Sequence, residues 1–74
     1  MTDGEKIREY RLLNGLSQMD IVKYGDYPKT EKWIGQIERN AVTTNKENIK
    51  EIYNHIAIAR FNKDRAKLEQ EQKQ

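Results

Sequence analysis

The stretch from residue 17 to residue 40 constrains the fold of this 74-residue chain more than any other. Its first half is predicted to be a short helix. Ser17 stands three residues before Asp20. This is a variant of the capping box, in which two side chains satisfy backbone N–H groups at the start of a helix. Ile21 and Val22 supply the apolar face, and we expect the helix to end at Gly25.

The second half of this stretch predicts another helix after a polar turn at residues 25–29. Thr30 is a suitable N-cap, and the helix is expected to continue through Arg39. Ile34 and Ile37 are three residues apart, so they lie on one face of a helix. Two short helices that are joined by a turn, each with one inward face, form a helix-turn-helix unit.

A preceding helix is predicted over residues 4–14. Gly15 matches a helix-terminating glycine, and Leu16 is placed to fold back onto that helix as its apolar partner.

The last predicted helix begins at Thr44, with Glu47 three residues later as a second capping box. Its apolar residues have the i, i+3, i+4, i+7 spacing of one helix face: Ile49, Ile52, Tyr53 and Ile56. Almost every residue after Phe61 is charged or carries an amide, which favours a helix but gives it little to bury. We therefore expect a domain at residues 1–60 and a polar tail at 61–74, helical or frayed.

Composition limits the possible functions. The chain has no cysteine, which excludes disulfides and thiolate metal sites. No apolar run approaches the ~20 residues of a membrane span, and no signal-peptide pattern opens the chain, so we expect a cytoplasmic protein without a membrane partner. A net charge of +2 is too small to indicate nucleic acid by itself.

Catalytic and metal-binding patterns are missing from the sequence. His55 is the only histidine, and it lies beside the apolar stripe of its helix without the three or four ligands that a metal requires. Ser17 lacks a recognisable base, and no glycine-rich phosphate loop is present. We expect neither an enzyme nor a cofactor, metal or small-molecule site.

Three segments occur in a distinctive order: Ile-Arg-Glu-Tyr-Arg at 7–11, Gly-Leu-Ser-Gln at 15–18 and Ile-Glu-Arg-Asn at 37–40. In this order and spacing the chain resembles the lambda-repressor-like family of phage repressors and Cro proteins, over roughly residues 4 to 58. The resemblance implies a compact all-α domain of four or five helices whose second and third helices bind double-stranded DNA. It also implies a homodimer on paired half-sites, in the bacterial cytosol or a phage-infected cell.

Site residues follow from the resemblance by position. It implies base-reading side chains at Thr30, Glu31, Lys32 and Gln36. It implies phosphate contacts from Gln18, Arg39, Asn40, Thr43 and Thr44. Lys46 is added to the candidate phosphate-contacting residues because it lies at the start of the same predicted helix as Thr44. Arg11 and Glu38 match a structural ion pair between the first and third helices.

The residue types suit these roles. The major groove admits one helix, in which Gln36 can pair with adenine and Lys32 can donate to guanine or to a phosphate. Glu31 suits only a cytosine amino group, because phosphates repel it. The alternatives are a solvated helix face for these three, and simple capping roles for Gln18 and Thr44.

Two features differ from the family pattern: the turn is longer, and Val22 stands where a small alanine is usual. Trp33 is expected to pack over this turn, against Tyr24 or Tyr27. The alternative is an exposed aromatic that contacts a sugar or a thymine methyl.

The apolar residues Ile52, Ile56 and Phe61, with Ala57 and Ala59, exceed what we expect one small core to use. We predict that the surplus forms a dimer seam, and the alternative is that it closes the chain's own core. A two-fold dimer would place two recognition helices roughly 34 Å apart, one turn of DNA.

The sequence therefore predicts a sequence-specific DNA-binding regulator, a small repressor of a phage or mobile element. The alternative is a protein-interaction module on the same fold, an antirepressor or adaptor. The low net charge, the acidic Glu31 and the aromatic Trp33 favour that alternative.

Overall fold

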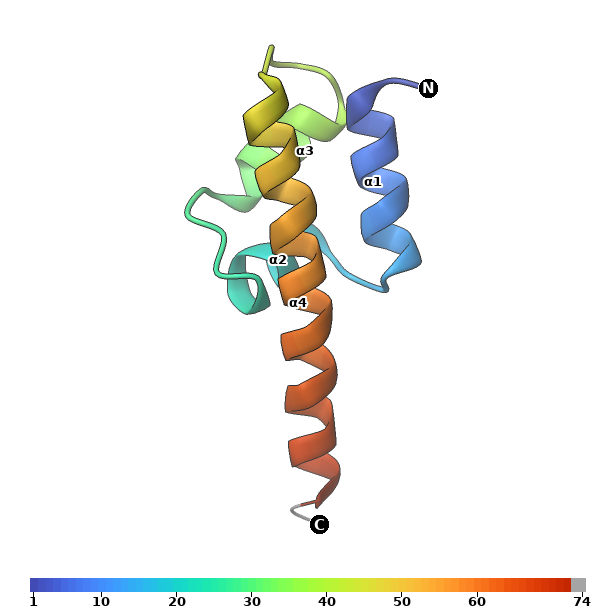
Figure 1. The fold of residues 1–74 in the computed structure, drawn as a ribbon, viewed down its shortest axis with the longest axis vertical. Coiled ribbons are helices and arrows are strands. Elements are labelled where there is room, and N and C mark those ends of the chain that lie inside the picture. Colours follow the sequence, from blue (N-terminus) through green and yellow to red (C-terminus); the bar gives the residue numbers. More distant parts are fainter. Residues whose placement is uncertain (73–74) are drawn as a thin grey trace.

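The computed structural model describes residues 1–72, with the side chains of residues 1–70, and this part of the chain is all-α, as predicted. Its four helices are α1 (Asp3–Leu13), α2 (Gln18–Tyr24), α3 (Glu31–Glu38) and α4 (Lys46–Gln72). In Figure 1, the first three helices gather around the N-terminal half of α4, and the C-terminal half of α4 projects beyond them. No helix in residues 1–72 combines the length and apolar character of a membrane span.

The predicted signals at the α1–α2 junction are confirmed. Gly15 has a φ of 68°, and the N–H of Leu16 donates to the carbonyl of Arg11 over 3.2 Å, which ends α1 in a Schellman motif. Ser17 Oγ accepts from the Asp20 N–H over 3.1 Å, and Asp20 Oδ2 accepts from the Ser17 N–H over 2.9 Å. These reciprocal bonds fix the direction in which α2 leaves the turn.

The predicted cap of α4 is wrong. Helix α4 begins at Lys46, and its first turn is capped by Asn45, whose Oδ1 accepts from the N–H of Asn48 over 2.8 Å. Thr44 Oγ1 is instead buried without a hydrogen-bond partner. Asparagine is at least as good an N-cap as threonine, and here it displaces the helix start from the position that Thr44 predicted.

Five isoleucines that are fully shielded from solvent fill the core, and every helix contributes at least one: Ile7, Ile21, Ile34, Ile52 and Ile56. Burying an aliphatic side chain of this size stabilises a fold by roughly 1.5–3 kcal/mol. Ile52 and Ile56 therefore belong to the chain's own core, and their prediction as a dimer seam is wrong. Ala59 is buried with them, whereas Phe61 is 66% exposed.

The helix α4 continues without a break through residue 60 to Gln72, so residues 61–72 adopt the helical alternative for the tail. Residues 73 and 74 lie outside the described part. Polar contacts hold the first turn of this segment: Asn62 Nδ2 donates to the Tyr24 carbonyl over 2.6 Å, and Lys63 Nζ donates to Asp20 over 2.8 Å. Both contacts tie α4 to α2.

Candidate nucleic-acid interface

Helix α3 separates an inward apolar face from an outward polar face. Thr30 Oγ1 accepts from the N–H of Trp33 over 3.3 Å and caps the helix, and Ile34 and Ile37 are buried as predicted. The rest of α3 and its C-cap carry four of the ten candidate reading and phosphate residues. Of these, Glu31, Lys32 and Arg39 are exposed and Gln36 is half-buried.

Gly35 lies at the contact between α3 and α2, where it is buried, and its role was missed from the sequence. A Cβ built on Gly35 would lie 3.4 Å from both Oε1 and Nε2 of Gln18 and 3.2 Å from Nη1 of Arg39. The Gln18 and Arg39 side chains therefore converge over the one position of α3 that has no side chain. A glycine in the middle of a short helix was the available signal, because glycine costs about 1 kcal/mol there relative to alanine.

A buried ion pair fixes the Gln18 side chain. Arg11 Nε and Nη2 donate to the two carboxylate oxygens of Glu38 over 2.7 and 2.8 Å, as the resemblance implied. Arg11 Nη1 also donates to the Leu16 carbonyl over 2.9 Å. Gln18 Nε2 donates to Glu38 Oε1 over 3.3 Å, which leaves its second N–H for another acceptor. This network joins α1, the α1–α2 turn, α2 and α3.

The α3–α4 loop gathers three of the predicted phosphate residues. Asn40 has a φ of 58°, and its Nδ2 donates to Thr2 Oγ1 over 3.0 Å. Asn40, Thr43 and Thr44 share the lining of a cavity of about 300 Å³ between this loop and the start of α1. Asp3 lies in the same lining, and its carboxylate opposes a phosphate there. Asn40, Thr43 and Thr44 therefore lie close together, but the acidic Asp3 makes their cavity less favourable for a phosphate.

Lys46 does not line this cavity. It is the first residue of α4, and its side chain is exposed. Its charge can therefore reach a phosphate only outside the hollow.

The α2–α3 turn is closed by aromatic side chains. Asp26 adopts a left-handed φ of 53°, and Tyr27 is only 5% exposed. Burial raises the pKa of Tyr27; the nearby Trp33 indole opposes the rise and the charge of Glu51 adds to it. The Trp33 Nε1 is nevertheless buried without a hydrogen bond of good geometry. Trp33 therefore packs against the turn, as its structural interpretation predicted.

One cation covers the outer side of Trp33. Lys29 Nζ lies 4.5 Å from the centroid of the indole ring. This contact adds a positive charge beside the start of α3, a role that was not predicted for Lys29 from the sequence.

His55 has a structural position. Its Nδ1 lies 2.6 Å from the Gly25 carbonyl oxygen, and its ring packs edge-on against Tyr27 with centroids 5.1 Å apart. Within residues 1–72, no three potential metal-ligating side chains form a cluster.

Glu31, Lys32 and Gln36 thus lie on α3, Thr30 caps its start, and Gln18 and Arg39 meet beside its Gly35. A second group of charged residues on α4 lines another cavity; it consists of Arg60, at the end of the predicted domain, and Lys63, Asp64 and Lys67 of the predicted tail. No protein-family model, curated protein or solved structure matches this chain.

Proposed function

We propose that this chain is a lambda-repressor-like transcriptional regulator that binds double-stranded DNA in a sequence-specific manner. The observation that carries the proposal is the Arg11–Glu38 pair, which holds Gln18 over Gly35. It locks α2 against α3 while the polar face of α3 stays open to solvent. We place its activity in a bacterial cytosol or a phage-infected cell, as a small repressor of a phage or mobile element.

In this mechanism α3 enters the major groove, where each base pair presents its own donor and acceptor pattern. Gln36 pairs with adenine and Lys32 donates to guanine, while Glu31 accepts from a cytosine amino group. Phosphate contacts from Gln18 and Arg39, with those of the α3–α4 loop, set the register on the duplex. A bound regulator then blocks polymerase by occupying the promoter.

A second copy of the chain completes the proposed regulator. The exposed side of α4 carries Ile58, Phe61 and Leu68, which are 45%, 66% and 57% exposed. Their spacing of three and seven residues keeps them on one side of the helix. An antiparallel or crossed pair of α4 helices would bury these side chains and place two α3 helices on successive turns of DNA.

Fluorescence anisotropy of labelled duplexes tests the DNA function. The full chain is titrated against DNA from upstream of its own gene and against scrambled DNA, at several salt concentrations. We expect tighter binding to the upstream DNA and a steep fall with salt. Binding that is absent, or that is equal for both duplexes and insensitive to salt, would argue against DNA recognition. Equal binding that falls with salt would indicate a DNA binder whose target lies elsewhere.

Two variants distinguish base recognition from electrostatic contact with the phosphates. Gln36→Ala is expected to relax base preference at one position per half-site, whereas Lys46→Ala is expected to weaken binding to all sequences and to flatten the salt slope. If Gln36→Ala leaves both affinity and preference unchanged, the base-reading assignment of α3 is wrong.

The second candidate is a protein-interaction module. The exposed Glu31 on the presumed reading face and the exposed Phe61 on α4 favour it. An acidic group near phosphates weakens DNA binding, and an exposed aromatic side chain suits a protein partner. Tight binding to a partner protein, together with no DNA binding at low salt, would establish this candidate instead.

A further inference from the structure

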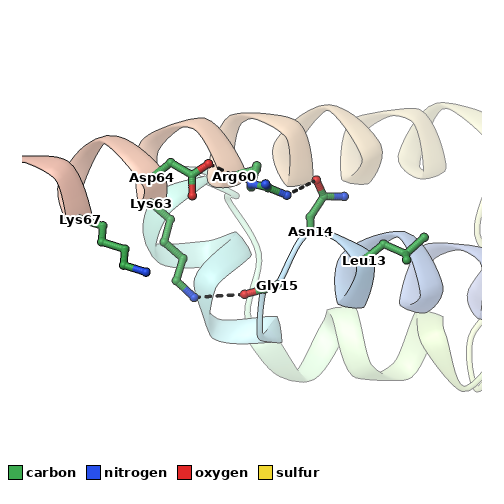
Figure 2. A pocket seen from close by; sticks show the side chains of 7 residues that line it. All are labelled: Leu13, Asn14, Gly15, Arg60, Lys63, Asp64 and Lys67. Atoms are coloured by element: carbon green, nitrogen blue, oxygen red, sulfur yellow. Dashed lines mark hydrogen bonds and ion pairs between the residues drawn. The ribbon is translucent and has the colours of Figure 1, made fainter.

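A cavity of about 330 Å³ lies where α4 leaves the other helices, at the junction of α1 and α2. One wall is the end of α1 and the following turn, residues 13–15. The other wall is α4, which contributes Arg60, Lys63, Asp64 and Lys67 (Figure 2). None of these residues belongs to the proposed DNA-reading face.

The charges in this lining are mostly positive. Three cations occupy positions i, i+3 and i+7 of α4, which are on one side of the helix, and only Asp64 is acidic. In Figure 2, the Lys63 and Lys67 side chains extend from α4 in the same direction. Like charges at i, i+4 repel each other, so an anion between them would be favourable.

Hydrogen bonds already hold two of the three cationic groups, those of Lys63 and Arg60, in place. Lys63 Nζ donates to the Gly15 carbonyl over 3.2 Å and to Asp20 over 2.8 Å, which uses two of its three N–H groups. Arg60 Nη1 donates to Asn14 Oδ1 over 3.2 Å, and its Nε donates to Asp64 over 2.9 Å. The Arg60–Asp64 pair is exposed, and such pairs are weak enough for another anion to replace the carboxylate.

A second cavity, of about 360 Å³, lies on the other side of the same lysines. Lys63 and Lys67 line it together with Tyr24 of α2. The two lysines therefore stand between two hollows, so a ligand can approach their ammonium groups from either side.

We infer that this corner between α1, α2 and α4 is a binding site for a phosphate group. The phosphate would accept hydrogen bonds from Lys63 and Lys67 and from the guanidinium of Arg60, in place of Asp64. Charge-assisted hydrogen bonds of this kind are the strongest that these side chains form. Two sources carry the same chemistry: a phosphodiester of bound DNA or a free phosphate.

The DNA strand is the favoured source, a choice that rests on the proposed function. Lys63 contacts both Gly15 and Asp20, which flank Ser17 and Gln18, where that proposal places a backbone phosphate. The α4 corner would extend the phosphate contacts beyond the helix-turn-helix unit.

The first arm of the test uses inorganic phosphate and the full chain. Two-dimensional NMR spectra follow the backbone amides of Asn14 and Gly15 during a phosphate titration, with sodium chloride at matched ionic strength as the reference. We expect saturable shifts, weakened by about threefold or more in Lys67→Gln. Lys50→Gln, which removes an exposed charge elsewhere on α4, should behave like the unmodified chain.

The second arm measures DNA affinity against salt. Loss of one phosphate contact should lower the slope of log K against log salt by about 0.9 in Lys67→Gln and leave it unchanged in Lys50→Gln. That result supports the site with DNA as its source. An unchanged slope together with Lys67-dependent phosphate shifts supports the site with free phosphate as its source.

The inference is overturned if the phosphate shifts are absent or equal in Lys67→Gln and the unmodified chain, and the salt slopes are also equal. If the unmodified chain binds no DNA, the proposed function fails, and the phosphate titration alone decides the site. The two failures are thus distinguishable.

Discussion

Arg11 and Glu38, which are 27 residues apart in the sequence, meet side-on with both carboxylate oxygens bonded to the guanidinium. The side chains are only 9% and 2% exposed. Taking one partner away from such a pair leaves the other charge buried, which typically costs about 3–5 kcal/mol. We expect Arg11→Met to lower the free energy of unfolding by about this amount in urea titrations.

The matched control for this prediction is the double variant Arg11→Met with Glu38→Met. Because it leaves no buried charge, it should recover most of the loss. A double variant that is no more stable than Arg11→Met would show that packing, and not the uncompensated carboxylate, causes the effect.

Gly35→Ala should separate stability from DNA binding. Alanine is favoured over glycine inside a helix by about 1 kcal/mol, so the melting temperature should rise or stay unchanged. The new methyl group would lie 3.2 Å from Arg39 Nη1, which must give way, and in contact with Gln18 at 3.4 Å, so DNA affinity should fall by about threefold to tenfold.

A double-mutant cycle checks the cause of that fall. In an Arg39→Ala background, Gly35→Ala should cost much less affinity, since the displaced side chain is already gone. Equal losses in both backgrounds would mean that Gly35→Ala acts through another contact.

At the start of α4, substitutions at two neighbouring positions should change the stability of the chain in opposite directions. Asn45→Ala removes the observed cap and should destabilise the chain by about 1 kcal/mol. Thr44→Val replaces an unpartnered buried hydroxyl with a methyl group and should stabilise it by about 1 kcal/mol. Thermal unfolding of both variants decides the matter, and a destabilised Thr44→Val would restore Thr44 as the cap.

Stability should depend on the Asp20 carboxyl in acid. Burial raises its pKa, but hydrogen bonds from Lys63 and from the Ser17 N–H outweigh this, so the net pKa lies below the ordinary value of 3.8. The folded state thus binds this proton less readily than the unfolded state. The stabilisation is present above pH 3.8 and is lost as the pH falls through the lowered pKa.

The comparison of Asp20→Asn with the unmodified chain measures this contribution. The difference in melting temperature should be largest near neutral pH and should shrink below pH 3.8. A difference that is independent of pH would assign the effect to lost capping geometry and not to the charge.

The proposed dimer predicts a specific sensitivity on α4. Phe61→Lys should raise the dimer dissociation constant by about tenfold, which corresponds to roughly 1.4 kcal/mol. Sedimentation equilibrium measures it, with Leu12→Lys on α1, where Leu12 is 54% exposed, as the control. Equal dissociation constants for Phe61→Lys and the unmodified chain would exclude this face of α4 as the dimer contact.

The features that could be predicted from the sequence are local. The capping box at Ser17, the N-cap at Thr30 and the end of α1 at Gly15 each depend on residues within one or two helical turns. The inward position of Ile34 and Ile37 depends on helical spacing alone. The Arg11–Glu38 pair is not local, and it was expected only from the resemblance.

The features that were missed depend on tertiary contacts. Spacing shows that Ile52 and Ile56 share a face, but it cannot show whether that face meets this chain or a second copy. Asn62 and Lys63 hold α4 through a backbone carbonyl and a carboxylate, which hydrophobic periodicity does not detect. The cavity at the α4 corner likewise exists only once distant segments are assembled.

The continuous helix α4 is mechanically connected to the helix-turn-helix unit that α2 and α3 form. His55 and Asn62 of α4 contact the carbonyls of Gly25 and Tyr24 at the end of α2, and Lys63 holds Asp20 near its start. The same helix continues beyond Lys63 for about 13 Å, at 1.5 Å for each of residues 64–72. A force on the projecting arm would therefore reach α2 first, and the network of Arg11, Glu38 and Gln18 would pass it on to α3.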